Sequence, residues 1–580
     1  MKKITILGIH SVHDAGAAIV QNGKILAAIN EERISNIKHH AGVPQKSIEE
    51  VFKIAKIHPS EIDAISIVNI KTSKFPKPFG RYPNYSDAVL NSITSTDQNG
   101  LEYIFSYNQR FRKLDEFNEI LTKIGVDVKN VIFVEHHAAH AAGAYYLSPS
   151  NLDEDVLIFT ADGNGDGISS TISVGQKGRL SRIENSESNY LDSLGAFYSN
   201  IVSYLGMNWA FDPFKLMGLA PYGKSDYCIE KIKTLMDIDD TNNLKFKNKS
   251  GSLLHITSDR LLHTYTMQPK LEMLLKDQRF DNIAAATQEW FEVLITKWIK
   301  NAIEKTGIHK IACAGGNFLN VKANKKILSM SEVDDAFFCP AAGDEGLAVG
   351  AALRGYFEMA FKDGIMPSKM PLRDSYFGSS FSNEEIEESL KKNNLLEKAE
   401  FIDDIDSETG ELLAKGSIVA RFSGKMEWGP RGLGNRSIIA NASNPSTVRT
   451  INKAIKMRDF WMPFAPSILN TRIEDYLIDA KSSPYMILSF DTTEKRNEMS
   501  AAIHPYDLTC RPQTVTSEYN PGYEKVLKSF EAKTGIGAIL NTSFNLHGNP
   551  IVWSPDIAID TFNNSDLDAI ALGNYLLKKN

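Results

Sequence analysis

The 580-residue chain is longer than one hydrophobic core usually supports, so we expect two or more domains. Its composition, with 42% apolar and 23% charged residues, is typical of a soluble globular protein. The formal net charge of −7 gives no general attraction for nucleic acid, so we expect no nucleic-acid partner.

Cysteine usage and apolar runs indicate the compartment. The four cysteines are Cys228, Cys313, Cys339 and Cys510. They lie far apart without a CxxC pair, which indicates neither a disulfide framework nor a zinc knuckle and fits a reducing compartment. Lys2 and Lys3 precede only a short apolar run that His10 interrupts, and no later run approaches the roughly 18 apolar residues of a membrane helix. We therefore expect a cytoplasmic protein without an export signal or a membrane anchor.

Residues 3–30 predict a strand meander, with KITILGI, AGAAIVQ and KILAAIN as strands and a turn at Asn22–Gly23. A similar unit returns at 155–184, where VLIFT and ISSTISVGQ flank a polar Gly/Asp turn. This weak repeat predicts two related halves that face each other across a cleft, each with a turn able to approach phosphate. Because the turns of any β meander contain Gly and Asp, the repeat alone does not decide the fold.

An insertion separates the two meanders. A helix near 45–57 and the strand DAISIVNI precede it, and a helix over 108–124 follows it. The insertion carries the basic residues Lys71, Lys74, Lys77 and Arg81. We interpret these as a solvated surface, although a local basic patch could also line a pocket.

The segment 135–146, EHHAAHAAGAYY, predicts an Ala-rich helix after the apolar strand VIFV. Positions i and i+4 of a helix share a face, so His136 and His140 can direct two imidazoles at one point. Capping or surface histidines are the alternative interpretation, because two imidazoles do not fill a coordination shell. Asp162 and Asp344 follow at predicted strand and loop ends and offer two carboxylates. Two His and two Asp suit Fe(II), Mn(II) or Zn(II).

Two later segments of the N-terminal half are informative. Residues 283–306 have apolar residues at helical spacing, and we expect their aromatic side chains in the core rather than around a cofactor. KIACAGGNFLNVKAN then predicts a strand, a turn at Gly315–Gly316 and a helix start, where backbone can approach a nucleotide closely.

Residues 362–381 lose periodicity and gain Pro, Gly and Ser, which indicates a domain boundary. Beyond it, helices and strands alternate, and several predicted strand ends carry cations. These cations are Arg431, Arg436, Lys456, Arg458 and Arg511, and a polar turn with Asn541, Ser543 and Asn545 follows. Guanidinium forks suit phosphate or carboxylate, so the set predicts a pocket for a polyanion such as ATP with its metal. For Arg431 and Arg436, a turn with solvated side chains is the alternative.

Together, these stretches resemble the carbamoyltransferase family of antibiotic, toxin and nodulation-factor biosynthesis, which includes the tobramycin O-carbamoyltransferase. The motifs that carry the resemblance span nearly the whole chain in the family's order: HDAGAAIV, EERISNIKH, EHHAAHAAGA, KLMGLAPYG, AGGNFLNVKAN, PAAGDEGLAVGAAL, EWGPRGLGNRS, MPFAPSIL and ILNTSFNLHGNPIV.

The resemblance implies an α/β protein with two domains. Residues 1–361 would form a duplicated domain of the actin-like ATPase type, similar to the tRNA threonylcarbamoyl-transfer proteins, and 362–381 a linker. Residues 382–580 would form a carbamoyl-adenylate-forming α/β domain with a twisted mixed sheet. The oligomeric state stays open, with a homodimer as one option.

The resemblance also implies site residues. The metal ligands would be His136, His140, Asp162 and Asp344, with Fe(II) favoured and Mn(II) or Zn(II) as alternatives. The contacts to carbamoyl phosphate and ATP would be Arg431, Arg436, Lys456 and Arg511, with Arg458, Asn541 and Ser543. The GGN turn would hold adenosine through Gly315, Gly316, Asn317 and Asn320, and His13 would assist transfer.

One departure from the family pattern concerns a phosphate contact. Met462 stands where the family usually has Arg before Pro-Phe-Ala-Pro, so one expected cation is absent, and Arg458, four residues earlier, is the candidate to compensate. Gly432 in place of the usual Ala is a milder change.

The implied reaction uses ATP with Mg(II), carbamoyl phosphate and a small hydroxyl-bearing acceptor. It forms carbamoyl-adenylate in the C-terminal domain and transfers the carbamoyl group in the N-terminal domain. Three alternatives remain: an actin-like sugar kinase or ATPase, a tRNA carbamoylation-type modification protein, and a catalytically weakened regulatory protein for which Met462 is the only support.

Overall fold

The computed structural model describes residues 3–68, 117–126, 130–250, 253–254 and 265–579. The basic residues of the predicted insertion and the first half of the predicted 108–124 helix lie outside these ranges, while 117–124 are helical. The chain divides into two compact units. The first unit comprises 1–26, 41–52 and 56–371, and the second unit comprises 27–40, 53–55 and 372–580. The main division falls between 371 and 372, and the domain limits drawn from sequence stay a prediction.

The first sheet of the first unit contains the N-terminal meander. Its strands run in the order β3 (Lys24–Asn30), β2 (Gly16–Gln21), β1 (Thr5–His10), β4 (Ala64–Val68) and β5 (Val131–Val134). Strand β1 is antiparallel to β2 and parallel to β4, and β4 is parallel to β5. The residues of β1 and β4 are buried throughout, as expected for strands covered on both faces.

The second sheet repeats this arrangement. Its strands run in the order β8 (Arg179–Arg182), β7 (Ile168–Gln176), β6 (Val156–Gly165), β14 (Lys310–Ala314) and β15 (Asp335–Phe338). Strand β6 is antiparallel to β7 and parallel to β14, and β14 is parallel to β15. The two sheets share one strand order and one pattern of directions, which confirms the duplicated, actin-like α/β fold.

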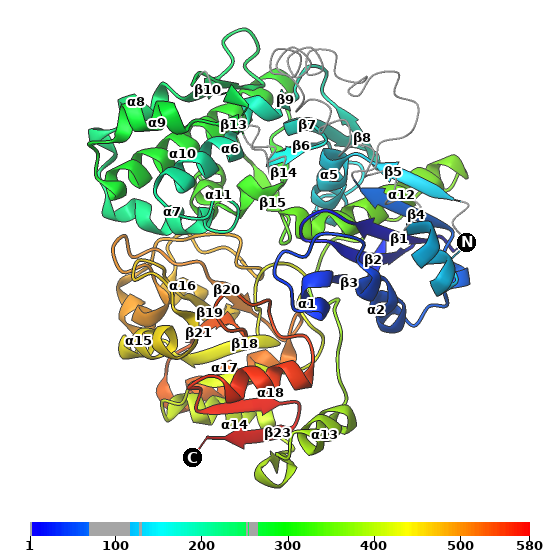
Figure 1. The fold of residues 1–580 in the computed structure, drawn as a ribbon, viewed down its shortest axis with the longest axis vertical. Helices are drawn as coiled ribbons and strands as arrows, with labels where there is room; N and C mark the ends of the chain where they lie inside the picture. Colours follow the sequence, from blue (N-terminus) through cyan, green and yellow to red (C-terminus); the bar gives the residue numbers. More distant parts are fainter. Residues whose placement is uncertain (1–2, 69–116, 127–129, 251–252, 255–264, 580) are drawn as a thin grey trace. The chain divides into compact units, whose positions relative to one another are not determined.

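Small residues allow two helices to pack closely on these sheets. Helix α12 (Leu347–Lys362) lies against β1, since a Cβ added at Gly8 would come within 2.0 Å of the Ala348 carbonyl oxygen. It also lies against α5 (His136–Leu147), since a Cβ at Gly350 would come within 2.0 Å of the Ala139 carbonyl oxygen (Figure 1). This packing fixes the histidine helix relative to the residues that precede α12.

The remaining helices of the first unit include α2 (Gln45–Ala55), α6 (Leu194–Tyr204), α7 (Pro213–Leu219), α10 (Phe280–Thr306) and α11 (Val321–Leu328). In α10, Trp298 is fully buried and its ring contacts those of Phe159 and Phe246. The expectation that the aromatics of this helix belong to the core is confirmed for Trp298.

The second unit is built on one mixed sheet. Its strands run in the order β16 (Glu400–Phe401), β23 (Tyr575–Lys578), β22 (Ala569–Leu572), β17 (Val419–Phe422), β18 (Arg436–Asn441), β21 (Ala538–Ser543), β19 (Ala465–Leu469) and β20 (Gln513–Val515). The pairs β17–β22 and β19–β20 are parallel, whereas β17–β18 and β18–β21 are antiparallel. The predicted mixed α/β sheet is therefore confirmed.

Helices α14 (Ile405–Ala414) and α17 (Pro521–Thr534) supply apolar side chains to the core of this sheet. The second unit also contains the short helices α1 (Glu31–Ser35), α13 (Asn383–Lys392), α15 (Ser446–Ile451), α16 (Ile473–Tyr476) and α18 (Pro555–Asn563). Within the described ranges, none of the helices has both the length and the apolar character that crossing a membrane requires.

Candidate functional site

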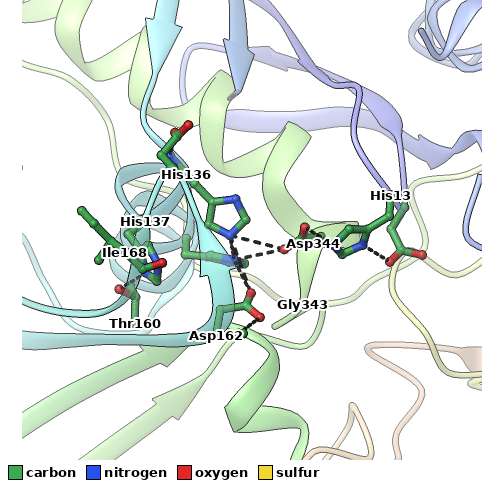
Figure 2. Close-up of polar contacts among 12 residues, drawn as sticks. His13, His136, His137, Thr160, Asp162, Ile168, Gly343 and Asp344 are labelled. Carbon is green, nitrogen blue, oxygen red and sulfur yellow. Dashed lines mark hydrogen bonds and ion pairs between the residues drawn. The ribbon is translucent and has the colours of Figure 1, made fainter. Parts of the chain in front are cut away.

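Four side chains from three elements of the first unit meet in one buried cluster (Figure 2). His140 Nε2 lies 3.1 Å from Asp162 Oδ2 and 3.5 Å from Asp344 Oδ1. His136 Nε2 lies 3.6 Å and 3.4 Å from the same two oxygens. One ligand atom from each residue lies within 4.8 Å of all the others. The structure therefore brings together the metal ligands predicted from sequence.

Each ligand has a local reason for its position. His136 and His140 stand one helical turn apart on α5, whose first amide groups are capped by carboxylates: the His136 N–H donates to Asp166 Oδ2, and the His137 N–H donates to Glu135 Oε1. Asp162 lies near the end of β6, and Asp344 begins the 3-10 turn before α12. Strand ends and helix starts thus supply the carboxylates, as the chain order suggested.

The cluster has the chemistry of a divalent metal site. Burial opposes charge on His140, but hydrogen bonds and charges of Asp162 and Asp344 outweigh it and raise its pKa to about 9. Burial likewise opposes charge on Asp162, but hydrogen bonds from His136 and His140 lower its pKa well below the usual range. Two imidazoles and two carboxylates converging in a buried space fit a borderline ion such as Fe(II), Mn(II) or Zn(II).

His13 lies beside this cluster. Its Nε2 is 3.1 Å from Asp344 Oδ2, and its Nδ1 is 3.0 Å from Asp14 Oδ2. The side chain is 60% exposed, so it can reach a bound substrate. The charge of Asp344 raises the pKa of His13 to about 10, against the opposing effect of desolvation. A proton acceptor at this position therefore requires that the charge of Asp344 be neutralised.

His10 was missed in the sequence. It is fully buried at the end of β1, and its Nε2 donates to the His13 carbonyl oxygen at 2.9 Å. Burial lowers the pKa of His10 to about 4, so the ring is neutral. Its position inside an apolar strand gave no sign that it holds the loop carrying His13.

Gly165 is a second residue that sequence reasoning missed. A Cβ added there would lie 2.0 Å from His136 Cδ2, too close for the ring to stay in place. We expect Gly165→Ala to weaken metal binding about 10-fold or more, because the imidazole must move out of the ligand cluster. Gly163→Ala is the matched control, since a Cβ at Gly163 meets nothing within 4 Å. Chelator competition on both folded variants measures the effect, and equal affinities would contradict it.

The predicted GGN turn lies against the metal cluster. A Cβ on Gly315 would come within 2.2 Å of the Ala161 carbonyl oxygen, and one on Gly316 within 3.1 Å of Asp162 Oδ1. Among the described residues, the buried Asn317 Nδ2 has no hydrogen-bond acceptor. Asn320 instead caps α11 and exchanges hydrogen bonds with Gln288. Nucleotide binding by this turn stays a prediction, and the geometry favours Asn317 over Asn320 as a direct contact.

Two of the predicted cations, Lys456 and Arg458, contact the end of β21. Lys456 is buried, and its Nζ donates to the Ser543 carbonyl oxygen at 2.6 Å and to Asn545 Oδ1 at 2.7 Å. Arg458 donates to Thr542 Oγ1 at 3.2 Å, and its guanidinium lies over the Phe464 ring. Within the described part of the chain, neither Lys456, Arg458 nor Arg511 forms an ion pair with a carboxylate.

Repulsion between these cations disfavours their protonated, positively charged forms. Burial, followed by repulsion from Arg431 and Arg458, lowers the pKa of Arg511 well below its usual range. Burial and Arg431 lower the pKa of Arg458 to about 10. Among the described residues, Lys456, Arg458 and Arg511 repel neighbouring cations and pair with no carboxylate, so they form a ready site for a polyanion.

Lys38 is a cation that the sequence did not assign to this set. It lies in the short N-terminal segment 27–40 that belongs to the second unit, and its charge acts on the buried Lys456, helping to lower the pKa of that lysine. Glu32 holds Lys38 through an ion pair of 3.3 Å. Sequence reasoning missed it because it is distant in the chain from the other cations.

The side chains of Arg436 and Asn541 form hydrogen bonds with other groups of the protein. Arg436 is fully buried over the Phe422 ring and donates to the carbonyl oxygens of Ser379, Ser423, Gly424 and Asn435. Asn541 Nδ2 donates to the Gly432 carbonyl oxygen, Ser467 Oγ and Gln513 Oε1. Their predicted substrate contacts stay untested, and these contacts favour a role in holding the loop that carries Arg431.

Comparison with known families identifies two family models that match the chain. Family models for the carbamoyltransferase N-terminus and C-terminus match residues 5–353 and 410–579. The chain belongs to the carbamoyltransferase family. It is therefore a carbamoyltransferase, as the motifs implied.

Relatives of this carbamoyltransferase span its whole length. Nodulation protein NolNO of Sinorhizobium fredii is 31% identical over 98% of this chain and 79% of its own length. An uncharacterized protein of Synechocystis is 32% identical, and the match covers 99% of this chain and 96% of that protein. An uncharacterized protein of Methanocaldococcus jannaschii is 32% identical, and the match covers 99% of this chain and 99% of that protein. Among solved structures, component A of the Acidaminococcus fermentans (R)-2-hydroxyglutaryl-CoA dehydratase is 14% identical. The match covers 62% of this chain and 99% of that chain, with a TM-score of 0.33.

Proposed function

We propose that this carbamoyltransferase forms carbamoyl-adenylate from carbamoyl phosphate and ATP in its second unit and transfers the carbamoyl group to a hydroxyl of a small molecule in its first unit. The observation that carries the first step is the set of mutually repelling cations around the buried Lys456. Such a set needs an anionic ligand, and the two phosphate-bearing substrates supply it.

In the first step, hydrolysis of carbamoyl phosphate would yield carbamate and phosphate. A carbamate oxygen would then attack the α-phosphorus of Mg(II)-bound ATP, and the bond to the β-phosphate would break to release pyrophosphate. Lys456, Arg458 and Arg511 would bind the charged groups and stabilise the negative charge that develops on the departing pyrophosphate. Arg431 would contribute from the loop that Glu427 holds through the Leu433 and Asn435 amides.

In the second step, the acceptor oxygen would bond to the carbamoyl carbon as the bond from that carbon to the AMP oxygen breaks. A divalent ion held by His136, His140, Asp162 and Asp344 would supply Lewis acidity toward the carbamoyl oxygen. With the charge of Asp344 neutralised by that ion, His13, exposed beside Asp344, would take the proton of the acceptor hydroxyl. Asn317 would offer its buried amide to the adenylate.

Mass spectrometry of products tests this function. The protein is incubated with ATP, Mg(II), carbamoyl phosphate and a panel of hydroxyl compounds, and we expect a carbamate ester of one acceptor together with AMP. A phosphorylated acceptor with ADP would support the sugar-kinase alternative instead. Modified tRNA in a parallel incubation would support the tRNA alternative.

Met462 provides a prediction about the anion site. A missing guanidinium costs about 1.5–3 kcal/mol in a partly desolvated anion pocket, roughly 10- to 150-fold in affinity, if nothing replaces it. Arg458 donates to the carbonyl oxygen of Pro463, the residue after Met462, so we expect Met462→Arg to leave activity unchanged or to lower the apparent KM for ATP or carbamoyl phosphate. We expect Arg458→Ala to be more damaging here than the same change would be in relatives that keep both arginines. Steady-state kinetics of both variants provide the measurement, and loss of adenylation in folded Met462→Arg would contradict the interpretation.

A further inference from the structure

His137 shares the first turn of α5 with the two histidine ligands, yet its ring points to other residues. Nδ1 lies 2.8 Å from Thr160 Oγ1, and Nε2 lies 3.0 Å from the Ile168 carbonyl oxygen. Figure 2 shows the ring directed at these two partners. The side chain is fully buried, so neither interaction is weakened by solvent.

The partners determine the tautomer of His137. The Ile168 carbonyl oxygen can only accept, so Nε2 carries the proton and donates it. In the neutral ring, Nδ1 is then an acceptor, and the Thr160 hydroxyl donates to it. Thr171 Oγ1 lies 2.7 Å from Thr160 Oγ1 and supplies the next donor. The donor and the acceptor of each hydrogen bond in this buried series, from Thr171 through Thr160 to His137 and Ile168, are therefore fixed.

These bonds connect the histidine helix to both strands of one hairpin. Thr160 lies on β6 two residues before Asp162, and Ile168 is the first residue of β7. His136 and His140 therefore stand on an element that His137 ties directly to the strand carrying Asp162. The ligand atoms tolerate little movement, since His140 Nε2 and Asp162 Oδ2 are only 3.1 Å apart.

We propose that His137 is a positioning residue of the metal centre. It does not bind the ion; its two hydrogen bonds set the distance between the histidine pair on α5 and Asp162 on β6. The inference rests on the proposed metal site, and it assigns a function to the middle histidine of the HHAAH motif.

The test measures metal affinity of the full-length protein with Co(II) and a competing chelator. His137→Phe keeps a ring but removes both hydrogen bonds, and we expect about 10-fold weaker binding, in the range typical for outer residues of metal sites. Tyr146→Phe is the matched control, because it removes a buried hydrogen bond to the Gly178 carbonyl oxygen from the far end of the same helix. It should lower thermal stability without changing Co(II) affinity.

Two conservative variants extend the test. Thr160→Val keeps the shape of the side chain but removes the hydroxyl, so it should weaken Co(II) binding several-fold even if His137→Phe does not fold. His137→Gln can still donate to the Ile168 carbonyl oxygen and should recover part of the affinity lost in His137→Phe.

Wild-type affinity in folded His137→Phe or in Thr160→Val would overturn the proposal, as would an equal loss in Tyr146→Phe. Absence of Co(II) binding by the wild-type protein would be a different failure, because it would remove the metal site of the proposed function itself.

Discussion

Replacing His136 and His140 together by alanine should abolish stoichiometric metal binding and carbamoyl transfer. The change removes both imidazoles and leaves Asp162 and Asp344 as two buried carboxylates, which are too few ligands for a tight borderline-metal site. Metal analysis of the purified variant after dialysis measures the loss, and circular dichroism shows that the variant keeps the secondary structure content of the wild-type protein.

His309→Ala is the control for this variant, because it removes an exposed histidine whose Nδ1 contacts only the Glu332 carbonyl oxygen among the described residues. It should bind metal as the wild-type protein does. Retained stoichiometric metal in the double variant would show that His136 and His140 are not the ligands.

Lys456→Ala and Arg511→Ala should each reduce carbamoyl-phosphate-dependent pyrophosphate release by about 10²–10³-fold, the effect of losing one preorganised donor to developing charge. Metal binding should persist, because the ligands belong to the other unit. Lys453→Ala is a matched control from the same short helix, where the Lys453 side chain is exposed. Colorimetric detection of pyrophosphate provides the assay.

These two variants also test whether the two steps are separate. Transfer from chemically supplied carbamoyl-adenylate should survive in both, because the proposed transfer site lies in the first unit. Loss of both steps together would instead indicate one composite site.

Patterns of local spacing led to four residues that the structure brings together, and their role as metal ligands stays a prediction. His136 and His140 are one helical turn apart, and that geometry is contained in the chain itself. Asp162 and Asp344 could be placed at strand and loop ends, and the resemblance supplied the pairing that spacing could not. The duplicated fold was likewise visible in two similar meanders, and the strand order then confirmed it.

Contacts between distant segments could not be predicted in this way. Gly165 affects the site only because the His136 ring of another segment packs against it, and nothing beside it in the chain indicates this. Lys38 joins cations far along the sequence, since 27–40 belongs to the second unit. Arg436 shows another limit: the sequence could not indicate that backbone carbonyl groups surround its guanidinium, and its predicted substrate contact stays a prediction.

The nucleotide products formed without an acceptor test the central claim most directly. The protein is incubated with ATP, Mg(II) and carbamoyl phosphate, and the products are separated by ion-exchange chromatography. Formation of carbamoyl-adenylate predicts pyrophosphate and, after hydrolysis of that intermediate, AMP, both only when carbamoyl phosphate is present. Release of ADP, or release of pyrophosphate that does not depend on carbamoyl phosphate, would contradict the proposed reaction.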